Sequence, residues 1–177
     1  MQIKINLLLP IIATLLLSSC FTSMLVAGTA AVTAVIYDQR DMATMKKDNQ
    51  IYYAMKEKIE NAPEFSESDI KIQSINQNLL LFGHVQNKPL IAKLSNLGHS
   101  IPNVKKVHNK TTVGPALTLQ QATKDTWITT KVKTRMLAEP SLRSMQVSVS
   151  TYNRVVYLVG ILPTKQAETA TQIARST

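Results

Sequence analysis

The chain repeats itself with a period of 77 residues, and this duplication constrains its fold more than any other feature. Asp48–Ile51 (DNQI) aligns without gaps with Asp125–Ile128 (DTWI), an offset of 77 residues. The same offset aligns Pro63 with Pro140, Ile70 with Val147 and Ile72 with Val149. It also aligns Ile75–Asn76 with Tyr152–Asn153. Further along, Leu79, Leu81 and Gly83 align with Val156, Leu158 and Gly160, respectively. Because internal repeats correspond to repeated structural units, the sequence predicts a duplicated domain.

Each copy predicts a helix, two strands and a second helix. Apolar residues recur four positions apart in both first helices (Ile51, Met55, Ile59; Ile128, Val132, Met136), which is typical of an amphipathic helix. Pro63 and Pro140 then end those helices. The predicted strands are 70–75, 79–85 and 104–112 in copy one and 147–149 and 155–161 in copy two, and the second helices are 88–100 and 164–176. The fold class is therefore α+β.

Asparagine and glycine residues stand at the turns and at the strand ends of the two predicted hairpins. Asn76, Asn78 and Asn153 stand at the turns, where Asn tolerates positive φ. Gly83 and Gly160 lack the spacing of a phosphate-binding loop. We expect them instead to permit close approach of the backbone at the strand ends.

The second copy is shorter than the first. Thr177 aligns with Ser100, so copy two is predicted to lack the equivalent of 101–113, including the third strand. That loss exposes unpaired backbone groups and an apolar face. Two explanations are open: truncation by a frameshift or early stop, which we favour, or a partner that fills the gap.

The N-terminus has the pattern of an exported, lipid-anchored protein. Residues 1–19 contain one charge (Lys4), an apolar stretch at 5–17 and small residues before Cys20, which predicts a signal peptide. The apolar stretch is shorter than the roughly 20 residues of a spanning helix. Leu17–Cys20 (LSSC) resembles a bacterial lipobox, in which the cysteine is acylated. The alternative is an ordinary signal peptide with an incidental cysteine.

The charge balance narrows the class of partner. The chain carries a net charge of +9, and +8 once the segment that contains Lys4 is removed. On a tethered protein, basic residues point first to anionic lipid headgroups. The export signal argues against nucleic acid, and a single cysteine leaves no internal disulfide.

The order αββαβ and three motifs resemble the BON domain. The hairpin strands read LLLFG (Leu79–Gly83) and VYLVG (Val156–Gly160), and Asp125–Lys133 reads DTWITTKVK. With the lipobox, the chain resembles the dual-BON-domain lipoproteins of Gram-negative outer membranes. The resemblance implies two tandem BON domains, phospholipid binding rather than catalysis, and a role in envelope integrity. Because Phe21 is not the Asp that retains such lipoproteins in the inner membrane, it also implies the periplasmic face of the outer membrane.

The predicted organisation follows from the repeat, the lipobox and this resemblance. The segments are a signal peptide at 1–19, a lipidated N-terminal segment and polar linker at 20–47, BON domain one at 48–113, a linker at 114–123, and the shortened BON domain two at 124–177.

One face of the helix predicted at 125–137 has the character of a lipid-binding surface. Trp127 lies opposite the apolar stripe on a helical wheel, shares its face with Thr130, Thr134 and Leu137, and is flanked by Lys131 and Lys133. An exposed indole beside lysines is typical of an interfacial membrane helix. The alternative is that Trp127 packs against domain one or the linker segment Gly114–Leu117.

The first copy differs at the corresponding positions, which are Gln50, Tyr53, Glu57 and Glu60. Carboxylates there would be repelled by an anionic surface, so domain two is predicted to meet the membrane. The acidic run Glu57, Glu60, Glu64, Glu67 and Asp69 predicts a solvated face or, alternatively, a docking surface for outer-membrane assembly proteins. His84, His99 and His108 lack ligand-like spacing. We therefore expect no metal, cofactor or enzymatic activity.

Overall fold

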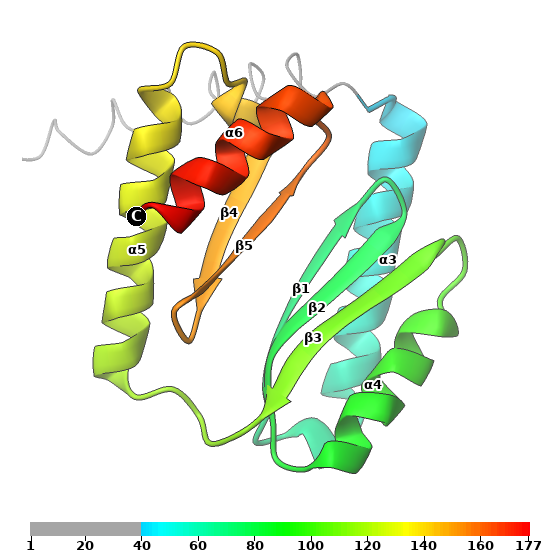
Figure 1. The fold of residues 1–177 in the computed structure, drawn as a ribbon. Helices are drawn as coiled ribbons and strands as arrows, with labels where there is room; N and C mark the ends of the chain where they lie inside the picture. Colours follow the sequence, from blue (N-terminus) through cyan, green and yellow to red (C-terminus); the bar gives the residue numbers. More distant parts are fainter. Residues whose placement is uncertain (1–39) are drawn as a thin grey trace, which may run out of the picture. The chain divides into compact units, whose positions relative to one another are not determined.

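The first repeat folds in the predicted order of helix, two strands, helix and strand (Figure 1). The computed structural model describes residues 40–177, so the predicted signal peptide and Cys20 lie outside the described residues. The elements of the first repeat are α3 (Met42–Glu60), the 3₁₀ turn η1 (Pro63–Phe65), β1 (Asp69–Ile75), β2 (Asn78–Val85), α4 (Lys88–His99) and β3 (Lys106–Val113).

The second repeat has the same order up to its second helix. Its elements are α5 (Leu119–Leu137), η2 (Ser144–Gln146), β4 (Val147–Tyr152), β5 (Val155–Gly160) and α6 (Thr164–Arg175). The first sheet has strand order β1-β2-β3, with β1 antiparallel and β3 parallel to β2. In the second sheet, β4 and β5 form an antiparallel pair. Within the described residues, the second sheet thus lacks the third strand, as predicted.

Each repeat has its own apolar core between helices and sheet. In the first repeat Ile51 and Met55 of α3 pack with Leu79 and Leu81 of β2. In the second, Val132 and Met136 of α5 pack with Val149 and with partly buried β5 residues. The helical stripes predicted from the sequence therefore face the cores.

Both long helices begin earlier than the sequence predicted. The α3 helix starts at Met42, within the predicted linker, because the Asp41 side chain accepts a hydrogen bond from Thr44 N. The α5 helix starts at Leu119 rather than at Asp125, because Thr118 and Gln121 form a reciprocal capping box. These caps stabilise helical turns that carry no apolar stripe of their own.

Buried aspartates join the first helix of each repeat to its hairpin turn. The Asp48 carboxylate accepts hydrogen bonds from the backbone of Asn76 and Gln77, at 2.8 and 2.7 Å. Asp125 accepts the equivalent pair from Asn153 and Arg154, at 2.7 and 2.8 Å. The sequence repeats both aspartates, but their role appears only in three dimensions.

The turn residues themselves have positive φ: Asn76 (49°), Gln77 (64°), Asn153 (47°) and Arg154 (64°). Two consecutive positive φ values are the requirement of a type I′ hairpin turn. The prediction that Asn78 also stands in the turn is wrong. It is the first residue of β2, and its side-chain amide donates to the carbonyls of Ile75 and Asn76.

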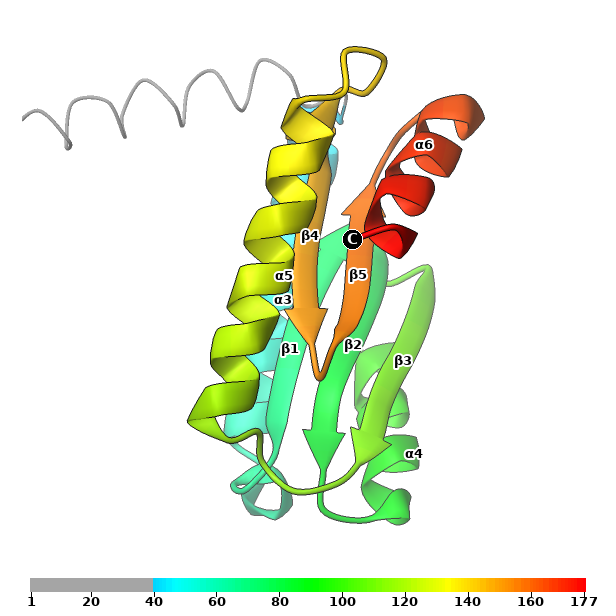
Figure 2. The same ribbon diagram turned by 60° about the vertical axis from the view of Figure 1, so that its left-hand side comes forward.

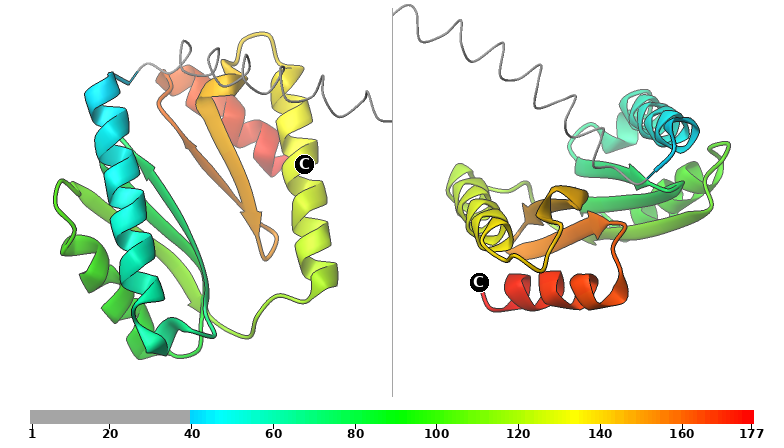
Figure 3. Two further views of the ribbon diagram at one scale, coloured as in Figure 1. Left: turned by 180° about the vertical axis from the view of Figure 1, so that it is seen from behind. Right: turned by 90° about the horizontal axis from the view of Figure 1, so that it is seen from above.

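The two sheets meet through the faces that their own helices leave uncovered, called the free faces here. Viewed from above, α3 and α6 lie on opposite sides with the strands between them (Figure 3, right). Figure 2 shows the β4–β5 hairpin lying along the first sheet, and the ring of Phe82 on β2 stacks on that of Tyr157 on β5 with 4.2 Å between centroids. The layers are therefore helices, sheet, sheet and helices.

Candidate functional site

The six residues predicted to bind lipid are all exposed on α5. They are Trp127, Thr130, Lys131, Lys133, Thr134 and Leu137. Trp127 is 62% exposed and Leu137 is 65% exposed. The two lie ten positions apart, so they are separated by about 15 Å along the helix axis. The structure therefore places two large apolar side chains in solvent on the side of α5 opposite its buried stripe.

Cations border this surface, and two of them also reach the end of α6. Lys131 Nζ lies 4.8 Å from the centroid of the Trp127 ring and donates to Thr177 O at 3.2 Å. Arg135 donates through Nη1 to Ser176 O at 2.7 Å. Arg135 is not among the residues predicted from the sequence to bind lipid, although its position beside Lys131 on the helical wheel would have indicated it. Lys133 is exposed.

The corresponding helix of the first repeat presents a different surface. Tyr53 is 64% exposed and packs edge to face against Tyr52, with ring centroids 5.2 Å apart. Glu57 is exposed, and Glu60 is paired with Lys56 at 3.6 Å. Equivalent positions of the two repeats therefore carry carboxylates on α3 and apolar and basic side chains on α5.

Contact between the repeats involves the free sheet faces, and Trp127 stays exposed. Gln73 on β1 donates to Ser150 Oγ on β4 at 2.8 Å. Phe82 also makes an edge-to-face contact with Tyr152, with ring centroids 6.4 Å apart. Trp127 is 62% exposed, and the contact between the repeats is formed by these polar and aromatic strand residues.

Tyr152 forms the centre of the buried part of this contact. Its hydroxyl is hydrogen-bonded to His84 Nδ1, and both side chains are buried. Burial of the phenol, followed by the charge of Asp69 and a hydrogen bond to it, raises the pKa of Tyr152 well above its ordinary value. Burial also raises the pKa of Tyr157. Both tyrosines are therefore held in the protonated form.

This shift predicts a specific alkaline instability. Above the ordinary tyrosine pKa of about 10, the unfolded chain releases the Tyr152 proton and the folded chain retains it. The contribution of protonated Tyr152 to the free energy of unfolding is therefore complete below about pH 10, and it declines as the pH rises toward the pKa of Tyr152 in the folded state. We expect Tyr152→Phe to flatten the fall of the unfolding free energy above pH 10 in urea titrations. Tyr53→Phe, at an exposed position, is the control, and equal pH slopes for both variants would contradict the assignment.

Two further kinds of feature can be assessed among residues 40–177: groups of metal-ligating side chains and membrane-spanning helices. No group of three or more His, Cys, Asp or Glu side chains in this range could hold a metal ion. Across the same range, no helix has both the length and the apolar character needed to cross a bilayer. The exposed face of α5 is the candidate functional surface because it carries Trp127, Leu137 and the neighbouring lysines.

Comparison with known proteins gives a family and two relatives. The family model for the BON domain matches residues 47–115 and 124–177. The chain is similar to the outer membrane lipoprotein DolP of Haemophilus influenzae, with 29% identity over 163 residues that cover 92% of this chain and 84% of that protein. It is also similar to the 21 kDa hemolysin of Actinobacillus pleuropneumoniae, with 30% identity over 110 residues, 62% of this chain and 57% of that protein.

Proposed function

Because the chain belongs to the BON-domain family, we propose that it is a non-enzymatic outer-membrane lipoprotein that binds anionic phospholipid through α5. In this proposal Cys20 carries the lipid anchor, and the two repeats lie on the periplasmic side of the outer membrane. Binding of phospholipid there supports the integrity of the envelope. The similarity to an outer membrane lipoprotein over most of the chain supports the location.

The exposed pair of Trp127 and Leu137 is the observation that carries the proposal. Large apolar side chains at 62% and 65% exposure cost free energy in water, and that cost is relieved at a membrane interface. The indole ring prefers the headgroup region. A surface of this kind on a rigid helix therefore favours a lipid partner.

The lysines determine which lipids are favoured. Each lysine near an anionic surface contributes on the order of 1 kcal/mol, and salt screens this attraction. Lys133 is exposed beside the apolar pair, and Lys131 lies over the Trp127 ring. The surface is therefore expected to prefer vesicles with anionic headgroups and to lose that preference at high salt.

In this proposal the acyl anchor already holds the chain at one membrane, since each buried methylene of an acyl chain contributes about 0.8 kcal/mol to the free energy of membrane binding. Recruitment therefore does not depend on Trp127. We propose that the α5 surface selects the lipid environment within that membrane. The anchor and the helix then have separate roles.

A flotation assay with a fragment of residues 40–177, which form one compact unit, tests the proposal. We expect Trp127→Ala to weaken binding to phosphatidylglycerol vesicles at least about tenfold, because burial of a large apolar side chain contributes 1.5–3 kcal/mol. Tyr53→Ala is the matched control, because Tyr53 is equally exposed but lies on the acidic face of α3. Its binding should equal that of the unmodified fragment.

Two results would contradict this function. One is equal binding of the Trp127→Ala and unmodified fragments. The other is equal binding to phosphatidylglycerol and phosphatidylcholine vesicles at low salt, because the lysines would then make no contribution. Far-UV circular dichroism of each variant shows that the fold is retained.

A further inference from the structure

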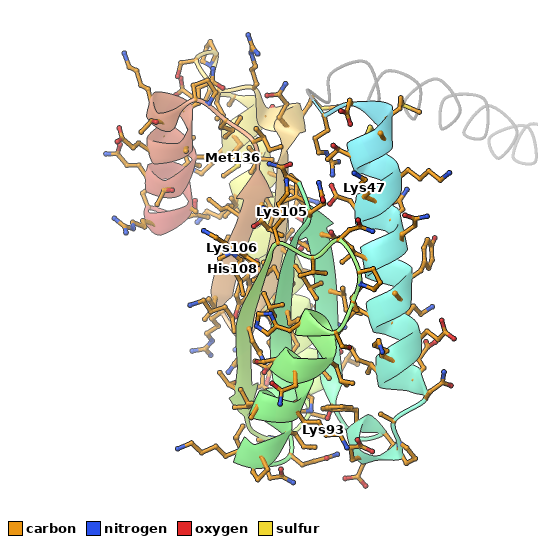
Figure 4. The ribbon with its side chains drawn as sticks, turned by 90° about the vertical axis from the view of Figure 1, so that its right-hand side faces the viewer. Lys47, Lys93, Lys105, Lys106, His108 and Met136 are labelled. Carbon is orange, nitrogen blue, oxygen red and sulfur yellow. The ribbon has the colours of Figure 1, made fainter. Side chains whose placement is uncertain are left out.

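Lysines gather at the end of the first repeat where α3 begins. Lys46 and Lys47 are exposed near the start of α3, and Lys105 is exposed just before β3. The Lys105 N–H donates to Gln77 O in the β1–β2 turn at 2.8 Å, and the same turn donates to the Asp48 carboxylate of α3. The three lysines therefore stand on neighbouring segments, and Figure 4 shows Lys47 and Lys105 toward this end.

The charge of these lysines is not balanced by ion pairs. Among the described residues, Lys46, Lys47 and Lys105 are paired with no carboxylate. The opposite end of the first repeat differs, because lysines and carboxylates pair there: Lys56 with Glu60, Lys71 with Asp69 and Lys93 with Glu64. Figure 4 shows Lys93 toward that opposite end. The first repeat is therefore basic where α3 begins and has paired charges where α3 ends.

The second repeat adds an exposed apolar side chain and two cations at the same end. Figure 1 shows that α5 ends and α6 begins at the end of the molecule where α3 begins. Met145 of η2 is 67% exposed, and Arg143 and Lys165 are also exposed. The Arg143 N–H donates to Gln166 Oε1 at 3.2 Å, which holds the loop before η2 against the start of α6. We call the set Lys46, Lys47, Lys105, Arg143, Met145 and Lys165 the basic pole.

The chain that leads from the proposed anchor joins the described residues at this pole. Arg40 directly precedes α3 and pairs with Asp48 at 2.5 Å. Cys20 lies twenty positions before Arg40, and a fully extended segment of that length reaches about 70 Å. The tether alone therefore leaves the orientation of the two repeats open. Charge can then decide it, because lysines are attracted to an anionic lipid surface and carboxylates are repelled by it.

We propose that the basic pole is a second lipid-contacting surface, which binds the phosphates of anionic headgroups through its lysines while Met145 enters the interface. This inference rests on the proposed function, since it concerns a chain that Cys20 already anchors. The pole orients the anchored chain and directs the carboxylates near the end of α3 away from the membrane. Leu137, the last residue of α5, lies at the same end, so the pole adjoins the exposed face of α5.

Fluorescence of the acylated full chain in vesicles tests the inference, because the anchor keeps every variant at the membrane. Met145→Cys, labelled with a polarity-sensitive dye, reports on the basic pole, and Trp127, the only tryptophan of the chain, reports on α5. The dye emission should be shifted to the blue in phosphatidylglycerol vesicles relative to phosphatidylcholine vesicles. Salt at about 1 M should reverse this shift, because the screening length falls to about 3 Å.

Charge reversals at the two ends of the first repeat separate the pole from general attraction. Lys46→Glu/Lys47→Glu in the labelled chain should abolish the dye shift and leave the Trp127 emission unchanged. Lys58→Glu/Lys88→Glu makes the same change of charge near the end of α3 and the start of α4, and it should retain the dye shift.

Three results would overturn the inference. One is a dye that does not shift while the Trp127 emission does, which leaves the proposed function of α5 intact. Another is an equal loss of the dye shift in both charge reversals. The third is a full chain that does not float with the vesicles, which contradicts the anchor and therefore the proposed function as well.

Discussion

Replacing Gly83 with alanine should lower the unfolding free energy by on the order of 3–5 kcal/mol. Gly83 has φ of +127°, a conformation that L residues rarely adopt, and it lies within β2 rather than at a loop. A Cβ atom there would lie 2.0 Å from the carbonyl oxygen of Asp69 on β1. The Cβ atom would be fixed to the backbone of β2, and the Asp69 carbonyl belongs to the backbone of β1. Neither strand can therefore move aside without breaking the β1–β2 pairing.

Urea unfolding followed by far-UV circular dichroism measures this effect. Gly114→Ala is the matched control, because a Cβ atom at Gly114 meets nothing within 4 Å. Gly160→Ala should also destabilise, because its Cβ atom would lie 2.5 Å from the carbonyl oxygen of Gln146. A Gly83→Ala protein as stable as the Gly114→Ala protein would show that the strand pair adjusts freely.

The second large effect is expected from Asp48→Ala, with a loss of about 3–5 kcal/mol. The Asp48 carboxylate is buried, accepts from Ser74 Oγ at 3.0 Å and from two turn amides, and pairs with Arg40 at 2.5 Å. Alanine leaves those amides without their acceptor inside the protein, and each unsatisfied buried donor costs about 1–3 kcal/mol. The hairpin of the first repeat should therefore lose its attachment to α3.

Two substitutions at exposed positions give the small losses of unfolding free energy with which the loss in Asp48→Ala is compared. Asp41→Ala removes only the exposed cap of α3 and should lower the unfolding free energy much less than Asp48→Ala does. Glu57→Ala changes an exposed position and should stay within about 0.5 kcal/mol of the unmodified protein. If Asp48→Ala lowers the unfolding free energy no more than these two substitutions do, the hairpin turn does not depend on the buried carboxylate.

Much of each repeat could be predicted because its signals are local. The four-residue spacing of Ile51 and Met55 indicated the buried side of α3, and the same spacing indicated that of α5. The outward position of Trp127 then followed from helix geometry alone, and its 62% exposure agrees with that prediction. The helix starts were less predictable, because side-chain caps at Asp41 and Thr118 set them without an apolar pattern.

The contacts of Asp48, Phe82 and Tyr152 could not be predicted in this way. Asp48 meets a turn that lies 28 residues away in sequence. Phe82 and Tyr157 belong to different repeats, and nothing in either strand specifies the other as its partner.

By itself, the sequence determined the duplication, the α+β order of each repeat and the polarity of each helix, because these depend on spacing between near neighbours along the chain. Only the tertiary structure decided that the free sheet faces meet each other and leave α5 exposed. The physical reason is that packing of one sheet on another depends on the shape and hydrogen bonding of residues far apart in sequence. Gln73 and Ser150, which join the faces 77 residues apart, are the clearest example.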